Sequence, residues 1–245
     1  MQKSGTLIVL VLALVAPPGF ADEETPAVAE LFACTYLDGK NWSDVEKVAK
    51  SYNAVLKKLG NGLEELRSYA WTPYRGNVPF DFLWSTNSPN LNEMARRSMI
   101  YDASEEGQAA DALWETVVDC QSGLVFQEVI LEAKTQPDLS KGYFIESYTC
   151  SIKPGKDMGD IRKAIKTWHA YVTKIGNDGP VFMRTLRVGN YPFDLAYFIV
   201  HQDLAAYASS STNYLTSKGA KATQDAFDAV QTCSGTLWRG QQMTP

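Results

Sequence analysis

Two kinds of hydrophobic pattern alternate along this chain: short apolar runs of strand length, and longer stretches with helical periodicity. In the first half, strands are predicted at four apolar runs, over residues 31–36, 67–72, 80–85 and 124–131. A helix is predicted after the first strand, because apolar residues recur every three or four positions at Val45, Val48, Tyr52, Leu56 and Leu59. A second helical region is predicted over residues 90–118, with a break near 104–107.

The second half of the chain repeats this order of elements. Strands are predicted over residues 143–152, 181–188, 193–201 and 236–241, and helices over 160–175 and 204–232. Individual residues also recur at matching places: Cys34 returns as Cys150, and Cys120 returns as Cys233. The segment GNVPFD at 76–81 returns as GNYPFD at 189–194. A repeat of this length indicates a duplicated domain, with repeat 1 over residues 31–131, a linker over 132–142 and repeat 2 over 143–245.

The first residues have the pattern of an export signal. Lys3 supplies a positive charge, residues 6–16 form an apolar run, and small residues precede a cleavage point after Ala21. The apolar run is too short to span a bilayer, so a membrane anchor is the less favoured alternative. We therefore expect a signal peptide over residues 1–21, a loose tail over 22–30, and a secreted or periplasmic mature protein.

Composition narrows the possible partners. The remainder of the chain has no apolar stretch long enough for a membrane span. The net charge is −5, and the basic residues are scattered without a Lys/Arg-rich run. A nucleic-acid partner is therefore not expected. No pattern in the sequence indicates an oligomeric state, a substrate or a reaction.

Each repeat follows the order strand-helix-strand-strand-helix-strand, which is the ferredoxin-like split pattern of α+β proteins. In that pattern the first and last strands are antiparallel neighbours. Cysteines stand late in each first strand and near the start of each last strand, in an exported chain where disulfides can form. Four cysteines allow three pairings. The duplication favours Cys34–Cys120 and Cys150–Cys233, whereas free thiols or zinc are less favoured because no CxxC spacing is present.

A single four-stranded sheet with helices on one face leaves its other face bare, and two copies can cover each other. The third strands support this arrangement, because residues 80–84 and 193–200 are apolar at nearly every position. In element order and apolar pattern the chain resembles the dimeric α+β barrel superfamily. The resemblance implies two tandem ferredoxin-like βαββαβ repeats packed as a pseudo-dimeric α+β barrel. It also implies a range of activities, since the superfamily includes small monooxygenases, isomerases, stress proteins and haem enzymes.

The common catalytic signatures are absent from the sequence, which has no GxSxG, P-loop, HExxH or EF-hand motif. His169, on the predicted first helix of repeat 2, stands where repeat 1 has Asn53. With His169, Gly176, Gly189 and the strand from Asp194, repeat 2 resembles the haem-binding half of the chlorite dismutase-like family. The resemblance implies that His169 would ligate haem iron, with Arg184 or Arg187 as the candidate distal arginine. The flanking acidic residue usual in that family is missing, and a structural polar residue is the alternative for His169.

Asp81 and Asp194 recur in both copies beside otherwise apolar strands, where a carboxylate needs a partner. The favoured interpretation is structural: each holds its Gly-Asn-x-Pro-Phe loop through backbone N–H groups. Otherwise they line the mouth of a pocket. The second histidine, His201, ends a strand just before Asp203, a predicted helix cap, and we expect it near the cap or at the surface.

Three functional hypotheses follow. The first is a binding protein without cofactor, holding a small apolar or aromatic ligand in a barrel-mouth pocket near His169, Asp194, Arg184, Asp81 and Asn53. The second is an enzyme, either a haem protein using His169 or a cofactor-free oxygenase or isomerase using Asp194 and His169. The third is a structural or interaction protein without a pocket.

Overall fold

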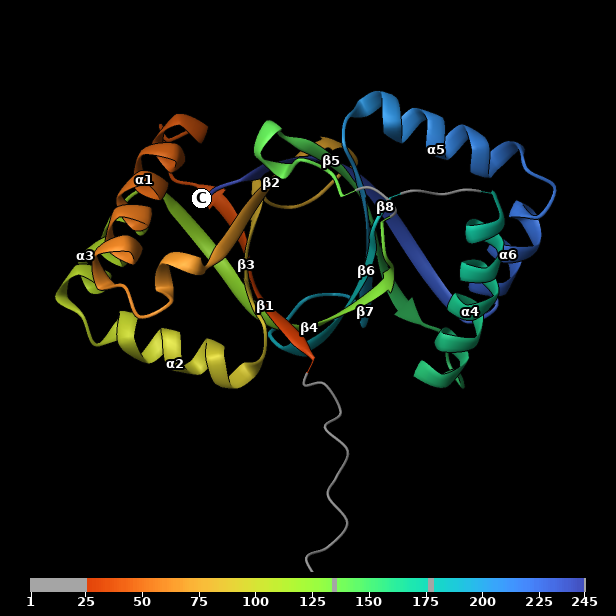
Figure 1. Ribbon diagram of the computed structural model, residues 1–245, viewed down its shortest axis with the longest axis horizontal. Coiled ribbons are helices and arrows are strands. Elements are labelled where there is room, and N and C mark those ends of the chain that lie inside the picture. The colour runs from red at the N-terminus through yellow and green to blue at the C-terminus, as the bar shows by residue number, and fades with distance from the viewer. Residues whose placement is uncertain (1–25, 134–135, 176–178, 245) are drawn as a thin grey trace, which may run out of the picture.

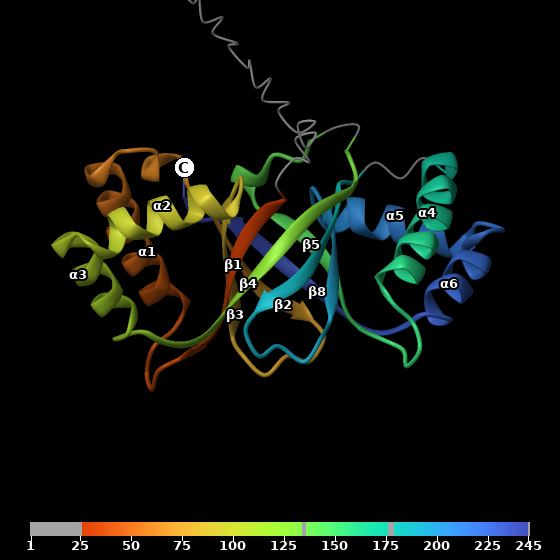
Figure 2. The same cartoon turned by 90° about the horizontal axis from the view of Figure 1, so that it is seen from below.

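The computed structural model describes residues 26–133, 136–175 and 179–244 (Figure 1). The predicted signal peptide lies outside the described residues, and so do residues 22–25 of the predicted tail. Within the described part, the chain forms one closed barrel of eight antiparallel strands in the order β1-β3-β2-β8-β5-β7-β6-β4. The helices form two groups on opposite sides of this barrel (Figures 1 and 2).

Both halves contain their predicted elements. In the first half these are β1 (Ala27–Tyr36), α1 (Trp42–Leu59), β2 (Arg67–Arg75), β3 (Phe82–Ser88), α2 (Leu91–Asp102), α3 (Glu105–Trp114) and β4 (Val118–Leu131). In the second half they are β5 (Tyr143–Ile152), α4 (Met158–Ile175), β6 (Val181–Val188), β7 (Leu195–His201), α5 (Leu204–Thr216), α6 (Ala220–Asp228) and β8 (Gln231–Gln242). Short 3₁₀ turns precede β2, at Leu63–Glu65, and β5, at Leu139–Lys141.

The two halves close the barrel by pairing with each other. Within the halves, β1 lies between β3 and β4, and β5 lies between β7 and β8. Between the halves, β2 pairs with β8 and β4 pairs with β6. The barrel interior is therefore one apolar core built from both halves, and its buried members include Leu31, Trp71, Leu83, Ile145, Phe198 and Trp238.

The third strands have the two-sided burial that their apolar sequence predicts. Along β7, Ala196 and Phe198 point into the barrel, whereas Leu195 and Tyr197 pack against helices on the outside. Side chains alternate across a strand, so both faces of β7 must be apolar. One core built from both halves therefore covers the inner face of the sheet.

Helices cover the outer faces of the sheet through one apolar side each. In α1 the buried residues Val45, Val48, Ala49 and Leu56 recur at helical spacing and pack on the outside of the barrel. The helix begins at a capping box in which the Asn41 side chain accepts from the Ser43 backbone N–H and the Asp44 carboxylate accepts from the Asn41 backbone N–H. Within the described residues, no helix is long and apolar enough to cross a membrane.

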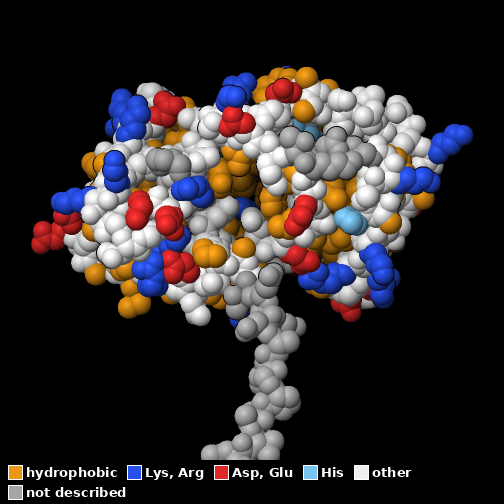
Figure 3. All heavy atoms as spheres, in the orientation of Figure 1, with side chains coloured by type: hydrophobic (Ala, Val, Ile, Leu, Met, Phe, Trp, Pro, Cys, Tyr) orange, Lys and Arg blue, Asp and Glu red, His pale blue; other side chains and the backbone are white. Residues whose placement is uncertain are grey.

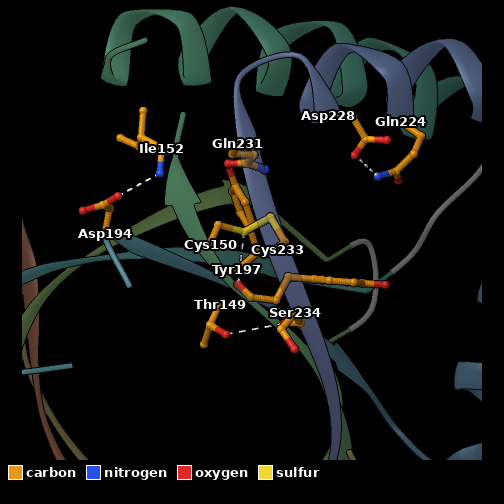
Figure 4. Close-up of a disulfide and its surroundings, with 11 residues drawn as sticks. Thr149, Cys150, Ile152, Asp194, Tyr197, Gln224, Asp228, Gln231, Cys233 and Ser234 are labelled. Atoms are coloured by element: carbon orange, nitrogen blue, oxygen red, sulfur yellow. Dashed lines mark hydrogen bonds between the residues drawn. A yellow bond between two sulfur atoms is a disulfide. The ribbon is translucent and has the colours of Figure 1, made fainter. Parts of the chain in front are cut away.

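Both predicted disulfides are confirmed. Cys34 pairs with Cys120 across β1 and β4, and Cys150 pairs with Cys233 across β5 and β8. Figure 4 shows the second bridge where the two strands lie side by side. Each bridge joins residues that are direct partners in the strand register, as the antiparallel first-strand and last-strand argument requires.

Several element boundaries differ from the sequence prediction. β1 begins at Ala27, inside the stretch expected to be a loose tail, because its start pairs with both β3 and β4. The helical region expected over 204–232 is two helices, α5 and α6, separated near Gly219. A Cβ at Gly219 would collide with the ring of Tyr171 on α4, so the close approach of these helices needs a glycine there.

Candidate functional site

Two pockets lie at equivalent places, one in each half, between the helices and the outer face of the sheet. The pocket of the first half has a volume of about 900 Å³, and that of the second half about 650 Å³. Both volumes are in the range of small-molecule sites. The sequence interpretation placed the pocket at the barrel mouth; these two pockets lie outside the barrel, between its outer face and the helices.

The floor of the second-half pocket consists of residues from the strands β4, β5, β6, β7 and β8. Ile145, Phe198 and Val200 point into the barrel, so their neighbours Glu146 and His201 point outward into the pocket. Six aromatic side chains line the pocket together with aliphatic and polar residues, and they come from β5, β7, α4, α5 and α6: Tyr148, Tyr197, Trp168, Tyr207, Tyr214 and Phe227. The lining therefore combines aromatic, aliphatic and polar side chains, and Glu146 and His201 form one polar corner of it.

In the polar corner, three groups converge from β5 and β7. The Tyr148 hydroxyl donates to Oε1 of Glu146 at 2.5 Å. The other oxygen, Oε2, lies 3.9 Å from Nε2 of His201, whose side chain is buried and whose Nε2 makes no hydrogen bond to the described residues. The His201 ring stands edge-on to Tyr207, with ring centroids 5.4 Å apart. Burial, followed by the charge of Glu146, raises the pKa of Tyr148, so this phenol remains a hydrogen-bond donor at neutral pH.

The first-half pocket has a related plan with different chemistry. Glu30 on β1 stands where repeat 2 has Glu146, and it also lines its pocket. Burial, and then the charge of Asp102, raises the pKa of Glu30. The Tyr101 hydroxyl donates to Asp111 at 3.0 Å, and burial raises the pKa of this aspartate as well. Where the second half has His201, the first half has Ser88, so the two pockets differ in chemistry at equivalent places.

His169 does not face a pocket, contrary to the expectation from the sequence. Its side chain is exposed on α4 and does not line either of the two pockets. The side of α4 that packs on the sheet carries Ile161, Ile165, Trp168 and Val172. His169 follows Trp168, and one residue further along a helix points about 100° away, so His169 leaves this side. The corresponding Asn53 on α1 is half-buried and donates through Nδ2 to the Met243 carbonyl at 2.6 Å, so it fastens the end of the chain.

Asp81 and Asp194 have the structural role favoured from the sequence. The Asp81 carboxylate accepts from the Tyr36 backbone N–H at 2.7 Å, and that of Asp194 accepts from the Ile152 backbone N–H at 2.8 Å (Figure 4). Their own N–H groups donate to the carbonyls of Cys34 and Cys150, both at 2.9 Å. Each aspartate thus ties its loop to the end of a first strand.

Arg184 and Arg187 also lie away from the pockets. Arg184 points into the barrel, on the opposite face of the sheet from the second-half pocket, and is buried. Arg187 is exposed, with its guanidinium 5.8 Å from the centre of the Phe126 ring. His201 was expected near the helix cap or at the surface, but its side chain is buried in the pocket wall. Glu146 and Tyr148 did not stand out from sequence alone. A usable signal was present, because the recurrence of Glu30 as Glu146 places a carboxylate inside both first strands.

The residues present do not fit haem in either pocket. His169, the expected iron ligand, is exposed, and Nε2 of His201 is covered by its surroundings and lies beside a carboxylate. Haem propionates need cationic partners, but the described residues around the second-half pocket include neither Arg nor Lys. The first-half pocket has Arg97, which is engaged by Glu93 at 2.6 Å, and it has no histidine among its described residues.

No protein-family model matches this sequence, and no curated protein is similar to it in sequence. Solved structures do share its fold. A protein described provisionally as a monooxygenase from Lactobacillus acidophilus NCFM has a TM-score of 0.59 at 11% identity, covering 89% of this chain and 97% of that chain. A dye-decolorizing peroxidase from Bacteroides thetaiotaomicron has a TM-score of 0.53 at 11% identity, covering 89% and 94%. A protein described provisionally as a chlorite dismutase has a TM-score of 0.52 at 12% identity, covering 89% of this chain and 95% of that chain.

These similarities define the class of fold. The chain is a mixed α/β protein with the α+β barrel architecture of chlorite dismutase-like structures. At identities near one residue in ten, the similarity concerns the fold alone, because one fold serves many unrelated activities. The function must therefore be argued from the two pockets and the residues in them.

Proposed function

We propose that this protein binds a small apolar or aromatic ligand in the second-half pocket, with the Glu146–His201 corner holding a polar group of the ligand. The observation that carries the proposal is a pocket of about 650 Å³ that six aromatic side chains line together with the half-buried Glu146 carboxylate and His201. Pockets of this size with apolar walls and few convergent polar groups are typical of small-molecule sites.

The charges around the pocket restrict the ligand further. Glu146 and Asp228 are acidic, and the described lining residues include no lysine or arginine. An anionic ligand would be repelled and would find no partner. A neutral or cationic aromatic compound with a hydroxyl or amino group fits better, because its donor can hydrogen-bond the Glu146 carboxylate.

The test uses 2-naphthol, a neutral aromatic compound with one hydroxyl donor, measured by calorimetry or by quenching of tryptophan fluorescence. Glu146→Gln removes the charged acceptor and keeps its size. We expect binding to weaken about ten- to a hundredfold, since a hydrogen bond to a charged group contributes ~1.5–3 kcal/mol. The matched control is Glu30→Gln, the same change at the equivalent place in the first-half pocket, which should leave the affinity unchanged.

Two results would contradict the proposal. Equal loss in both variants would show that the first-half pocket, or a general effect on folding, controls binding. Unchanged affinity in Glu146→Gln, together with unchanged affinity in Ala206→Phe, whose larger side chain fills the pocket from α5, would exclude this pocket as the site.

We also propose that the protein arose by duplication of a ferredoxin-like unit, with repeats over 31–131 and 143–245, and that it is exported. The matching element order, the equivalent disulfides and the equivalent Asp81 and Asp194 anchors support the duplication. Two disulfides also suit an oxidising compartment. Mass spectrometry of the secreted protein tests the export, and a mature chain beginning near Asp22 is the expected result.

A further inference from the structure

A cationic side chain lies inside the apolar barrel, on the face of the sheet opposite the second-half pocket. Arg184 on β6 is 3% exposed. Its Nε donates to Oε1 of Gln127 on β4 at 2.9 Å, and its Nη2 donates to Oδ1 of Asn87 on β3 at 3.3 Å. The third nitrogen, Nη1, is buried and has no hydrogen-bond partner within the described structure. Two neutral amides therefore hold one side of the guanidinium, and its tip is unsatisfied.

Two aromatic rings enclose the same guanidinium. Its Cζ lies 5.1 Å from the centre of the Trp71 ring and 5.0 Å from that of Phe198. Among the described residues, Arg184 has no carboxylate within ion-pair distance, although buried arginines are ordinarily paired. Burial lowers the pKa of Arg184 to about 10, and the group is still charged at neutral pH. The aromatic faces offset only part of the cost of this buried charge.

We infer that Arg184 anchors a second binding site, inside the barrel, for the carboxylate of a small organic acid. The free donors are the two hydrogens of Nη1 and the second hydrogen of Nη2, which together form the end-on fork that accepts a carboxylate in two parallel hydrogen bonds. Trp71 and Phe198 hold the plane of the guanidinium, and the amides of Gln127 and Asn87 fix its rotation. A fixed fork loses little conformational freedom on binding.

The site lies toward one end of the barrel. Gln127 pairs with Ala27, and Asn87 with Ala29, so Arg184 lies near the end at which β1 begins. Figure 2 shows that the β2–β3 and β6–β7 loops lie at the other end. There, the Tyr191 hydroxyl donates to the Gln121 carbonyl at 3.0 Å and helps close the barrel. Figure 3 views the end at which β1 begins and shows a hollow with a hydrophobic wall.

The walls near Arg184 select the body of the acid. Tyr69 and Tyr143 stand edge-on to each other with ring centroids 6.4 Å apart, and the Tyr143 hydroxyl accepts from Nε1 of Trp71 at 2.9 Å. Burial raises the pKa of both tyrosines, so neither adds a negative charge that would repel an anion at neutral pH. Aromatic walls around a fork of donors favour an aromatic or short aliphatic monocarboxylate.

The experiment uses benzoate as the probe and benzyl alcohol as its neutral counterpart, with the midpoint of thermal unfolding and Trp fluorescence as readouts. Benzoate should raise the midpoint in a concentration-dependent manner, and benzyl alcohol should not. Arg184→Met should weaken benzoate binding at least tenfold. The matched control is Arg187→Met, which removes an exposed arginine from the same strand and should leave binding unchanged.

The same variants separate a binding role from a structural one. A binding role predicts that Arg184→Met, without ligand, is as stable as the original protein or more stable, because an apolar residue replaces an unpaired buried charge. Loss of stability without any effect of benzoate on the original protein would overturn the inference. Equal benzoate binding in the original protein and Arg184→Met would also overturn it.

A second variant keeps the test decisive if Arg184→Met does not fold. Arg184→Lys keeps the charge but lacks the planar fork, so benzoate binding should weaken clearly; unchanged affinity would exclude the fork geometry. The inference is independent of the proposed function. Glu146→Gln should leave the benzoate effect intact, because Glu146 lies on the outer face of the sheet.

Discussion

Removing one disulfide gives a quantitative test of how the two halves depend on each other. The variant is Cys150→Ala combined with Cys233→Ala, which opens a loop between residues 83 positions apart. A loop of this length corresponds to about 4.5 kcal/mol at 25 °C in the chain-entropy model. The Cys34–Cys120 loop spans 86 positions and does not overlap it, so removal of both bridges should cost about 9 kcal/mol.

That sum approaches the whole stability of an ordinary domain, about 5–15 kcal/mol. We therefore expect the single-bridge variant to fold with a much lower urea midpoint, and the variant without bridges to be largely unfolded. Urea unfolding followed by both tryptophan fluorescence and far-UV circular dichroism measures the loss. The shared core also requires one transition in both probes, because Trp71 of one half packs on Phe198 of the other.

Two results would refute this reasoning. A cost below about 1 kcal/mol for one bridge would mean that the loop is already constrained in the unfolded chain. Two separate transitions, with only the second half lost at the first, would mean that the barrel core does not join the halves. Arg162→Ala, which removes an exposed pairing to Glu128, is a control that should change stability by less than about 0.5 kcal/mol.

Three further predictions concern individual residues. Asp194→Ala removes the acceptor of the Ile152 N–H and should lower stability by about 1 kcal/mol without changing ligand affinity. Asp81→Ala is its counterpart in the first half and should behave in the same way. A loss of ligand affinity at full stability would instead make these residues part of a binding site. His169→Asn should change neither unfolding nor the absorption and ligand binding of the protein, since the side chain is exposed; loss of a bound chromophore would contradict this. Burial raises the pKa of Tyr197 to about 12, above the value of about 10 in the unfolded chain, so its contribution to stability is complete below pH 10 and is lost as the pH rises toward 12. Ultraviolet titration of the original protein and Tyr197→Phe checks this sign, and an unshifted phenol would refute it.

Local sequence determined much of the framework. Strand identities followed from short apolar runs and helix identities from the period of 3.6 residues, and the matching order of elements allowed each half to be checked against the other. The disulfide pairing followed from this order, because antiparallel first and last strands place Cys34 beside Cys120 and Cys150 beside Cys233. The role of Asp81 and Asp194 was also predicted from their recurrence. A carboxylate that recurs beside a turn is expected to accept hydrogen bonds from backbone N–H groups, and both do so.

The tertiary structure alone decided where the chemistry lies. Sequence periodicity shows that Glu146 and His201 point to opposite sides from their strand neighbours, but it does not show which side is the barrel and which the pocket. The same limit applied to Arg184, whose inward direction depends on the closure of β6 against β4. Trp71 and Arg184 occupy equivalent positions in the two repeats, and they come into contact only because the halves face each other across one barrel.

His169 is a residue that the sequence made conspicuous and that the structure places outside both pockets. Its difference from Asn53 made it the most conspicuous position in the sequence, yet it lies one residue beyond the inward stripe of α4 and is exposed. Asn53 is half-buried, and its amide donates to the Met243 carbonyl from a segment 190 positions away in the sequence. Sequence pattern determined the elements and their covalent links, because these depend on neighbouring residues. Contacts between distant segments decided burial, pairing and pocket chemistry, because these depend on which faces meet when the barrel closes.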